Sequence, residues 1–105
     1  MSNEERLREL VDEATVDCYD EEEQFWGMLA TLGDALDFPI TATLIGEQVE
    51  LIGIDSETSS SHRGIVARVR HKGQEYSVSL ADLQINDTNS HNVEWLAAYH
   101  YWLRY

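Results

Sequence analysis

Five carboxylates are crowded into seven residues just ahead of two large aromatic side chains. The acids are Asp17, Asp20, Glu21, Glu22 and Glu23, and the aromatics are Phe25 and Trp26. Two exposed unit charges about 7 Å apart repel by roughly 0.6 kcal/mol in water, so the cluster is costly unless something offsets the repulsion. A hard divalent cation would do so, because it prefers carboxylate and carbonyl oxygen. The cluster is therefore a candidate metal site.

The same acids have a second interpretation as a solvated helix N-terminus. Negative side chains there interact favourably with the helix dipole, by roughly 0.3–1 kcal/mol each. Asp20 is a suitable N-cap, and Glu23 three residues later completes a capping-box pattern. The dipole explains one or two of the acids, but not all five. It also disfavours Asp34 and Asp37 at the other end of the same predicted helix, so both interpretations stay open.

Other kinds of site have less support in the sequence. Residues 55–66 fail as an EF-hand loop, because Ser60 stands where glycine is needed and Val66 where glutamate is needed. The four histidines include no closely spaced pair, so we do not expect a zinc site. Acidic Asp17 next to Cys18 disfavours a reactive thiolate. The sequence also lacks a phosphate loop and a dinucleotide fingerprint, and we do not expect an enzyme.

Most of the negative charge lies in the N-terminal third. The 105 residues have a net charge of −13; residues 1–37 hold twelve acids and two arginines, whereas residues 38–105 hold eight acids and five basic residues. Such a field repels nucleic acid and anionic membranes and attracts cations or basic proteins. The chain has one cysteine, no long apolar run and a charged start unlike a signal peptide, so we expect a single cytoplasmic domain.

Apolar side chains at helical spacing predict three helices, over Glu4–Thr15, about Glu21–Leu36 and residues 93–105. Pro39 forbids continuation of the second helix. One face of the third helix is formed by Trp95, Ala98, Tyr99 and Trp102. The two N-terminal helices and the C-terminal helix should pack on whatever lies between them.

Between the helices the pattern changes to the period of two that is typical of strands. We expect a polar loop at residues 55–63, a hairpin turn with Gly73 at positive φ, and a second polar loop that caps the last helix. The expected strands are residues 40–45, 48–54, 65–70 and 75–80, with a short strand or a single turn at 82–85. This order predicts an α+β fold: a small SH3-like bent antiparallel sheet or barrel with two N-terminal helices and one C-terminal helix.

Six segments in this order resemble the CcbP-type calcium-binding proteins of cyanobacteria and other bacteria. They are DCYDEEEQFWGM, FPITA, LIGEQVELIGI, RGIVARVRHKG, VSLADLQ and AAYHYWL. The resemblance runs from Thr15 to Tyr105. It implies a small acidic domain that binds Ca²⁺ without EF-hands and buffers or senses it in the cytoplasm.

By position, the resemblance points to a set of acidic metal-site candidates. Asp17 and Glu23 occupy the acidic places of the motif DxYxxxEQ, Asp82 is the acid of LADL, and Asp37 precedes FP. Asp20 is a further candidate, together with its two neighbouring glutamates. We expect Asp17 and Glu23 to act together, with Asp82 or Asp37 completing the site. The rival hypothesis is an acidic protein-interaction module that binds a basic partner.

Overall fold

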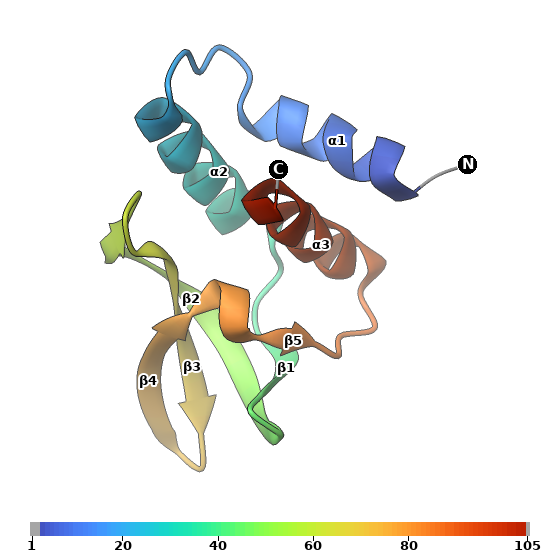
Figure 1. Ribbon diagram of the computed structural model, residues 1–105. Helices are drawn as coiled ribbons and strands as arrows, with labels where there is room; N and C mark the ends of the chain where they lie inside the picture. The colour runs from blue at the N-terminus through green and yellow to red at the C-terminus, as the bar shows by residue number, and fades with distance from the viewer. Residues whose placement is uncertain (1–2, 105) are drawn as a thin grey trace.

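The computed structural model describes residues 3–104, in which three helices gather at one end of a five-stranded sheet (Figure 1). The helices are α1 (Asn3–Ala14), α2 (Glu21–Ala35) and α3 (Ser90–Arg104). All three predicted helices are confirmed, with ends within a few residues of the expected ones. No helix in this described range is both long and apolar enough to cross a membrane.

The start of α2 is determined by its local sequence. Asp20 is the N-cap, and its Oδ1 accepts a hydrogen bond from the Glu23 N–H at 2.7 Å. Glu23 Oε1 in turn accepts from the Tyr19 N–H at 3.0 Å. The two bonds satisfy backbone donors that have no partner inside the helix. At the other end Leu36 has extended backbone, and Pro39 follows shortly.

Helix α3 begins at a cap supplied by the second polar loop, as predicted. Asn89 Oδ1 accepts hydrogen bonds from the N–H groups of His91 and Asn92 at 2.9 and 3.3 Å. Trp95, Ala98 and Tyr99 are buried further along the helix. The Tyr99 hydroxyl accepts a bond from the Ile65 N–H at 3.3 Å, which attaches the helix to the sheet.

The sheet is antiparallel and open, with strand order β4-β3-β2-β1-β5. A single 3₁₀ turn, η1 (Leu80–Asp82), connects β4 to β5, so this region contains both the turn and the short strand that were expected as alternatives. The strands are β1 (Ile40–Leu44), β2 (Glu47–Ser60), β3 (Gly64–His71), β4 (Gln74–Ser79) and β5 (Gln84–Ile85). The mixed helix-and-sheet class predicted from the sequence is confirmed.

Two of the hairpins, β1–β2 and β3–β4, have two-residue turns with positive φ at each position. Ile45 and Gly46 have φ of 47° and 79°, and Lys72 and Gly73 have φ of 51° and 80°. This is the pattern of a type I′ turn, whose twist matches that of the flanking strands. The conformation expected for Gly73 is confirmed.

The polar loop predicted at residues 55–63 is wrong for most of its length, because β2 continues to Ser60. A change of register between Asp55 and Ser60 gives this part of the strand an irregular pairing with β3. Ser59 is buried there: its hydroxyl donates to the Asp55 carbonyl at 2.7 Å and accepts from the Val66 N–H at 2.8 Å. Serine thus replaces a missing ladder bond, which hydrophobic periodicity does not reveal.

The hydrophobic core lies between the helices and the sheet. Fully buried members include Met28 and Leu32 of α2, Leu51 of β2, Ile65 of β3 and Leu96 of α3. None of the five acids proposed as metal ligands belongs to this cluster. The core is therefore built without any of the candidate ligands, and we expect the metal-free protein to be folded.

Candidate metal centre

The acids at the start of α2 take different partners. Asp20 and Glu23 form the capping box, so the capping interpretation of these two residues is confirmed. Glu22 Oε1 instead accepts from the Ser61 hydroxyl at 2.9 Å and so contacts the turn after β2. An ionised carboxylate has two oxygens and about four lone-pair positions, so a single capping bond leaves capacity for a cation.

Asp17 lies three residues before the N-cap, in the connection from α1 to α2. Its side chain is exposed and its backbone is left-handed, with φ of 61°. Aspartate tolerates this conformation better than most residues. The chain therefore turns sharply between Asp17 and Asp20, and the carboxylates of Asp17, Asp20 and Glu23 belong to one end of α2.

A second polar cluster lies beyond the other end of α2, around Asn92 of α3. Only 1% of Asn92 is exposed. Its Oδ1 accepts from the Asp37 N–H at 2.8 Å, and its Nδ2 donates to the Asp37 carbonyl at 3.1 Å and to Asp87 Oδ2 at 2.6 Å. The buried amide thus joins the α2–β1 connection to the β5–α3 loop. We call Asp37, Asp87, Asn89 and Asn92 the junction cluster.

The junction cluster brings together two carboxylates that lie 50 residues apart in the sequence. Asp37 is exposed and Asp87 is half-buried. Asn89 Nδ2 donates to Asp37 Oδ2 at 3.3 Å, while the oxygen of the same amide caps α3. Each carboxylate thus accepts a hydrogen bond from an amide group, and that of Asp87 accepts from the buried Asn92.

The five predicted ligands do not meet at one point. Helix α2 has 15 residues, which corresponds to a length of about 22 Å, so one ion cannot contact both the Asp17–Glu23 end and Asp37. Asp82 is exposed in η1 and lines a separate surface pocket of about 470 Å³ with His100. Burial, with a smaller effect of Arg104, lowers the pKa of His100. The roles of the five predicted acids as metal ligands stay predictions.

Within residues 3–104, no three Asp, Glu, His or Cys side chains are grouped closely enough to hold a metal by themselves. A Ca²⁺ shell of six to eight oxygens would need amide or backbone carbonyls and water besides the carboxylates. Both ends of α2 supply such oxygens, and the single Cys18 near the start of α2 does not make up the set of thiolate and imidazole ligands of a zinc site. The donor set therefore fits a hard cation.

Sequence reasoning missed three members of the junction cluster: Asp87, Asn89 and Asn92. Their segment, NDTNSHN, was interpreted only as a polar loop and helix cap. Its density of Asp and Asn oxygens was the available signal. The missing information was the contact with Asp37, which depends on tertiary structure.

Comparison with known proteins gives a family match and two structural matches. A family model named Calci_bind_CcbP and described as "Calcium binding" matches residues 8–103. The crystal structure of Anabaena CcbP is 25% identical, with a TM-score of 0.81 over 98% of this chain and 92% of that chain. A structure described as "Calcium binding protein in the calcium-binding form" is 24% identical, with a TM-score of 0.76 over 96% and 90% of the two chains. No curated protein sequence gives a significant match.

Proposed function

The chain belongs to the CcbP-type family of calcium-binding proteins, as its sequence resemblance indicated, and we propose that it buffers Ca²⁺ through carboxylates at the two ends of α2. The observation that carries the proposal is the junction cluster. There Asp37 and Asp87 approach one buried amide from segments far apart in the sequence. The cluster contains the oxygen donors that Ca²⁺ prefers.

Each residue of the junction cluster has a proposed part. Asp37 and Asp87 are the candidate ligands, because their carboxylates can each present a second oxygen. Asn92 and Asn89 are positioning residues, since their NH₂ groups already donate to those acids. Water and nearby carbonyl oxygens would complete the shell. A bound ion would supply the positive charge that offsets the repulsion between the two carboxylates.

The acids before and within the first turn of α2 form the second candidate position. Asp17 and Glu23 remain proposed ligands there, with Asp20 as a further one. All three are exposed, and the capping bonds of Asp20 and Glu23 already use part of their oxygen, which suits a weaker site. Asp82 lies apart from both positions and is the least supported of the five.

Buffering is favoured over sensing because the fold needs no ion to close. The capping bonds of α2 and α3 are made by side chains of the protein itself, and the core contains none of the candidate ligands. A bound ion should therefore change the shape little.

The connection between α1 and α2 is six residues long, half the length of an EF-hand loop, which supports a non-EF-hand site. The strand order and the 3₁₀ turn before β5 support the SH3-like description of the sheet.

Calorimetric titration of matched variants tests the assignment. Asp37→Asn and Asp87→Asn should each weaken Ca²⁺ binding about tenfold, because ligand charge sets the affinity of such sites. Asp17→Asn and Glu23→Gln should remove a second, weaker phase. Asp12→Asn, in the exposed part of α1, is the control and should leave both phases unchanged. Unchanged binding in Asp37→Asn and Asp87→Asn would remove the junction cluster from the site.

An acidic module for a basic partner is the second candidate function. Beside the acids, Tyr19 is 85% exposed and Trp26 is 41% exposed. Exposed apolar patches that are rimmed by polar residues mark interaction sites. This function requires a partner, whereas Ca²⁺ binding should be measurable on the purified protein. The cytoplasmic location, the absence of nucleic-acid or membrane binding and the absence of enzymatic activity stay predictions from the sequence.

A further inference from the structure

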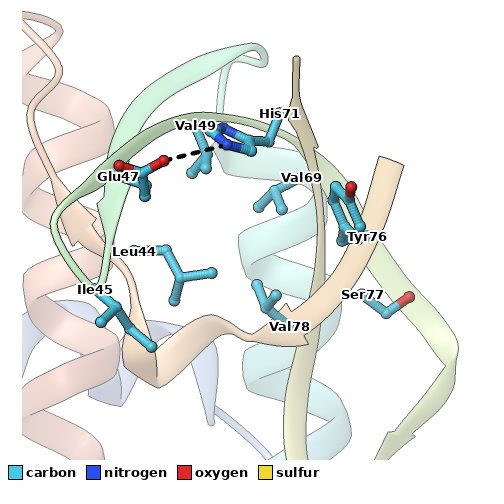
Figure 2. A pocket seen from close by; sticks show the side chains of 9 residues that line it. All are labelled: Leu44, Ile45, Glu47, Val49, Val69, His71, Tyr76, Ser77 and Val78. Carbon is cyan, nitrogen blue, oxygen red and sulfur yellow. Dashed lines mark ion pairs between the residues drawn. The ribbon is translucent and has the colours of Figure 1, made fainter. Parts of the chain in front are cut away.

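An apolar pocket of about 450 Å³ opens between the β1–β2 hairpin and the β3–β4 hairpin, near their turns (Figure 2). We call these two turns and the strand residues beside them the hairpin ends. These ends lie at the side of the sheet remote from the three helices (Figure 1). Leu44, Val49, Val69 and Val78 form its walls, and Tyr76 stands at its rim. The pocket belongs to neither candidate metal position, because it shares no residue with them.

Ile45 lies at the edge of this pocket, and the local structure does not explain why this position is an isoleucine. Its side chain is 94% exposed, and its backbone is left-handed with φ of 47°. A β-branched residue is a genuine outlier in that conformation. The first position of a type I′ turn favours Asn, Asp or Gly. Neither burial nor turn geometry explains an isoleucine here, and such an outlier is grounds for a functional hypothesis.

The charges around the pocket are balanced, unlike those of the rest of the chain. Glu47 lies at the rim 3.4 Å from His71 Nε2, and Lys72 in the β3–β4 turn supplies a positive charge beside them. Arg70 pairs with Glu50 and Arg68 with Glu75, at 3.5 and 3.4 Å. In contrast, residues 1–37 hold twelve acids and two arginines. A second chain of net charge −13 therefore meets the least repulsion at the hairpin ends.

We propose that the hairpin ends bind a second copy of this chain, with Ile45 of each copy inserted into the pocket of the other. A projecting side chain and a pocket on the same surface are self-complementary about a twofold axis. The pocket is lined by nine residues, fewer than the roughly 20–30 residues a side of a standard interface. The dimer should therefore be weak and concentration-dependent, with a dissociation constant on the order of 100 μM.

Sedimentation equilibrium from micromolar to millimolar protein tests the proposal. The wild-type chain should pass from monomer to dimer, and Ile45→Asn should weaken the dimer at least fivefold. Because Asn-Gly is the preferred type I′ sequence, this variant should keep its fold. Tyr76→Ser should also weaken the dimer. Leu103→Asn removes an exposed apolar side chain from the last turn of α3 and should have no effect.

Two further measurements distinguish a second copy of the chain from other occupants of the pocket. Added salt should strengthen an apolar contact between two acidic chains, whereas it would weaken a contact held by ion pairs. Concentration-dependent NMR shifts should appear at Leu44, Val69 and Val78. A wild-type chain that stays monomeric at millimolar concentration overturns the proposal, even if a small apolar ligand shifts the same resonances. An Ile45→Asn dimer as strong as the wild type, or a dimer lost in Leu103→Asn, also overturns it.

Discussion

Replacing Asn92 tests how much the junction cluster contributes to the free energy of unfolding. Asn92→Ala removes one acceptor from the Asp37 N–H and two donors, one to the Asp37 carbonyl and one to Asp87. A neutral hydrogen bond contributes about 0.5–1.5 kcal/mol and one to a charged group about 1.5–3 kcal/mol. Water that enters the emptied space offsets part of the loss. The free energy of unfolding should therefore fall by about 3 kcal/mol.

Urea denaturation in the presence of a chelator measures this change directly. Gln48→Ala is the matched control, because it removes an exposed amide from β2 and should change the free energy of unfolding by less than about 0.5 kcal/mol. If Asn92→Ala costs no more than the control, the junction is not held by the buried amide. The positioning role assigned to Asn92 would then be incorrect.

Asn92→Asp tests whether Ca²⁺ binds at the junction cluster. This substitution keeps the size of the side chain but replaces the donor to Asp87 with a third carboxylate. Without an ion the repulsion should destabilise the protein strongly. With Ca²⁺ at about 100 times the dissociation constant, linkage should restore about 2.7 kcal/mol. No recovery in Ca²⁺ would argue against an ion at the junction.

Three other substitutions have expected outcomes. Asp20→Ala removes the N-cap of α2 and should cost about 1 kcal/mol in a thermal melt while leaving Ca²⁺ binding at the junction intact. Ile45→Asn should raise the free energy of unfolding of the monomer by about 1 kcal/mol, measured at low protein concentration, because Asn tolerates the left-handed backbone better. Hydrogen bonding from Thr58, followed by a smaller effect of Arg68, lowers the pKa of Asp55 below its usual 3.8. The stability from Asp55 is therefore present above that pH and is lost as the pH falls below it, so Asp55→Asn should flatten the acid limb of stability measured by urea denaturation across this range. An unchanged melting temperature in Asp20→Ala would contradict the first expectation, and a less stable Ile45→Asn monomer would contradict the second. An unaltered acid limb in Asp55→Asn would contradict the third.

Local features of the fold could be predicted well from the sequence. The capping box of Asp20 and Glu23 and the Gly73 turn depend on residues within a few positions of each other in the chain, so sequence spacing is sufficient to find them. Ser59 shows the limit of this reasoning. Its hydroxyl bonds to β3 within an irregular strand pair, and its polar segment therefore looked like a loop.

The candidate site shows the same distinction. The acids near the start of α2 were visible as a cluster because they lie within seven residues of sequence. The junction cluster was not, because Asn92 reaches Asp37 across 55 residues. A polar residue in an amphipathic pattern normally indicates a solvated position, whereas Asn92 is buried and satisfied. Only the tertiary structure identifies it.

The central claim is that this chain binds Ca²⁺ through its own carboxylates, and calorimetric titration of the chelator-treated wild-type protein tests it most directly. We expect saturable heat with a dissociation constant of roughly micromolar to tens of micromolar, and weaker binding of Mg²⁺, which demands stricter geometry. Heat indistinguishable from buffer dilution at millimolar Ca²⁺ would contradict the claim.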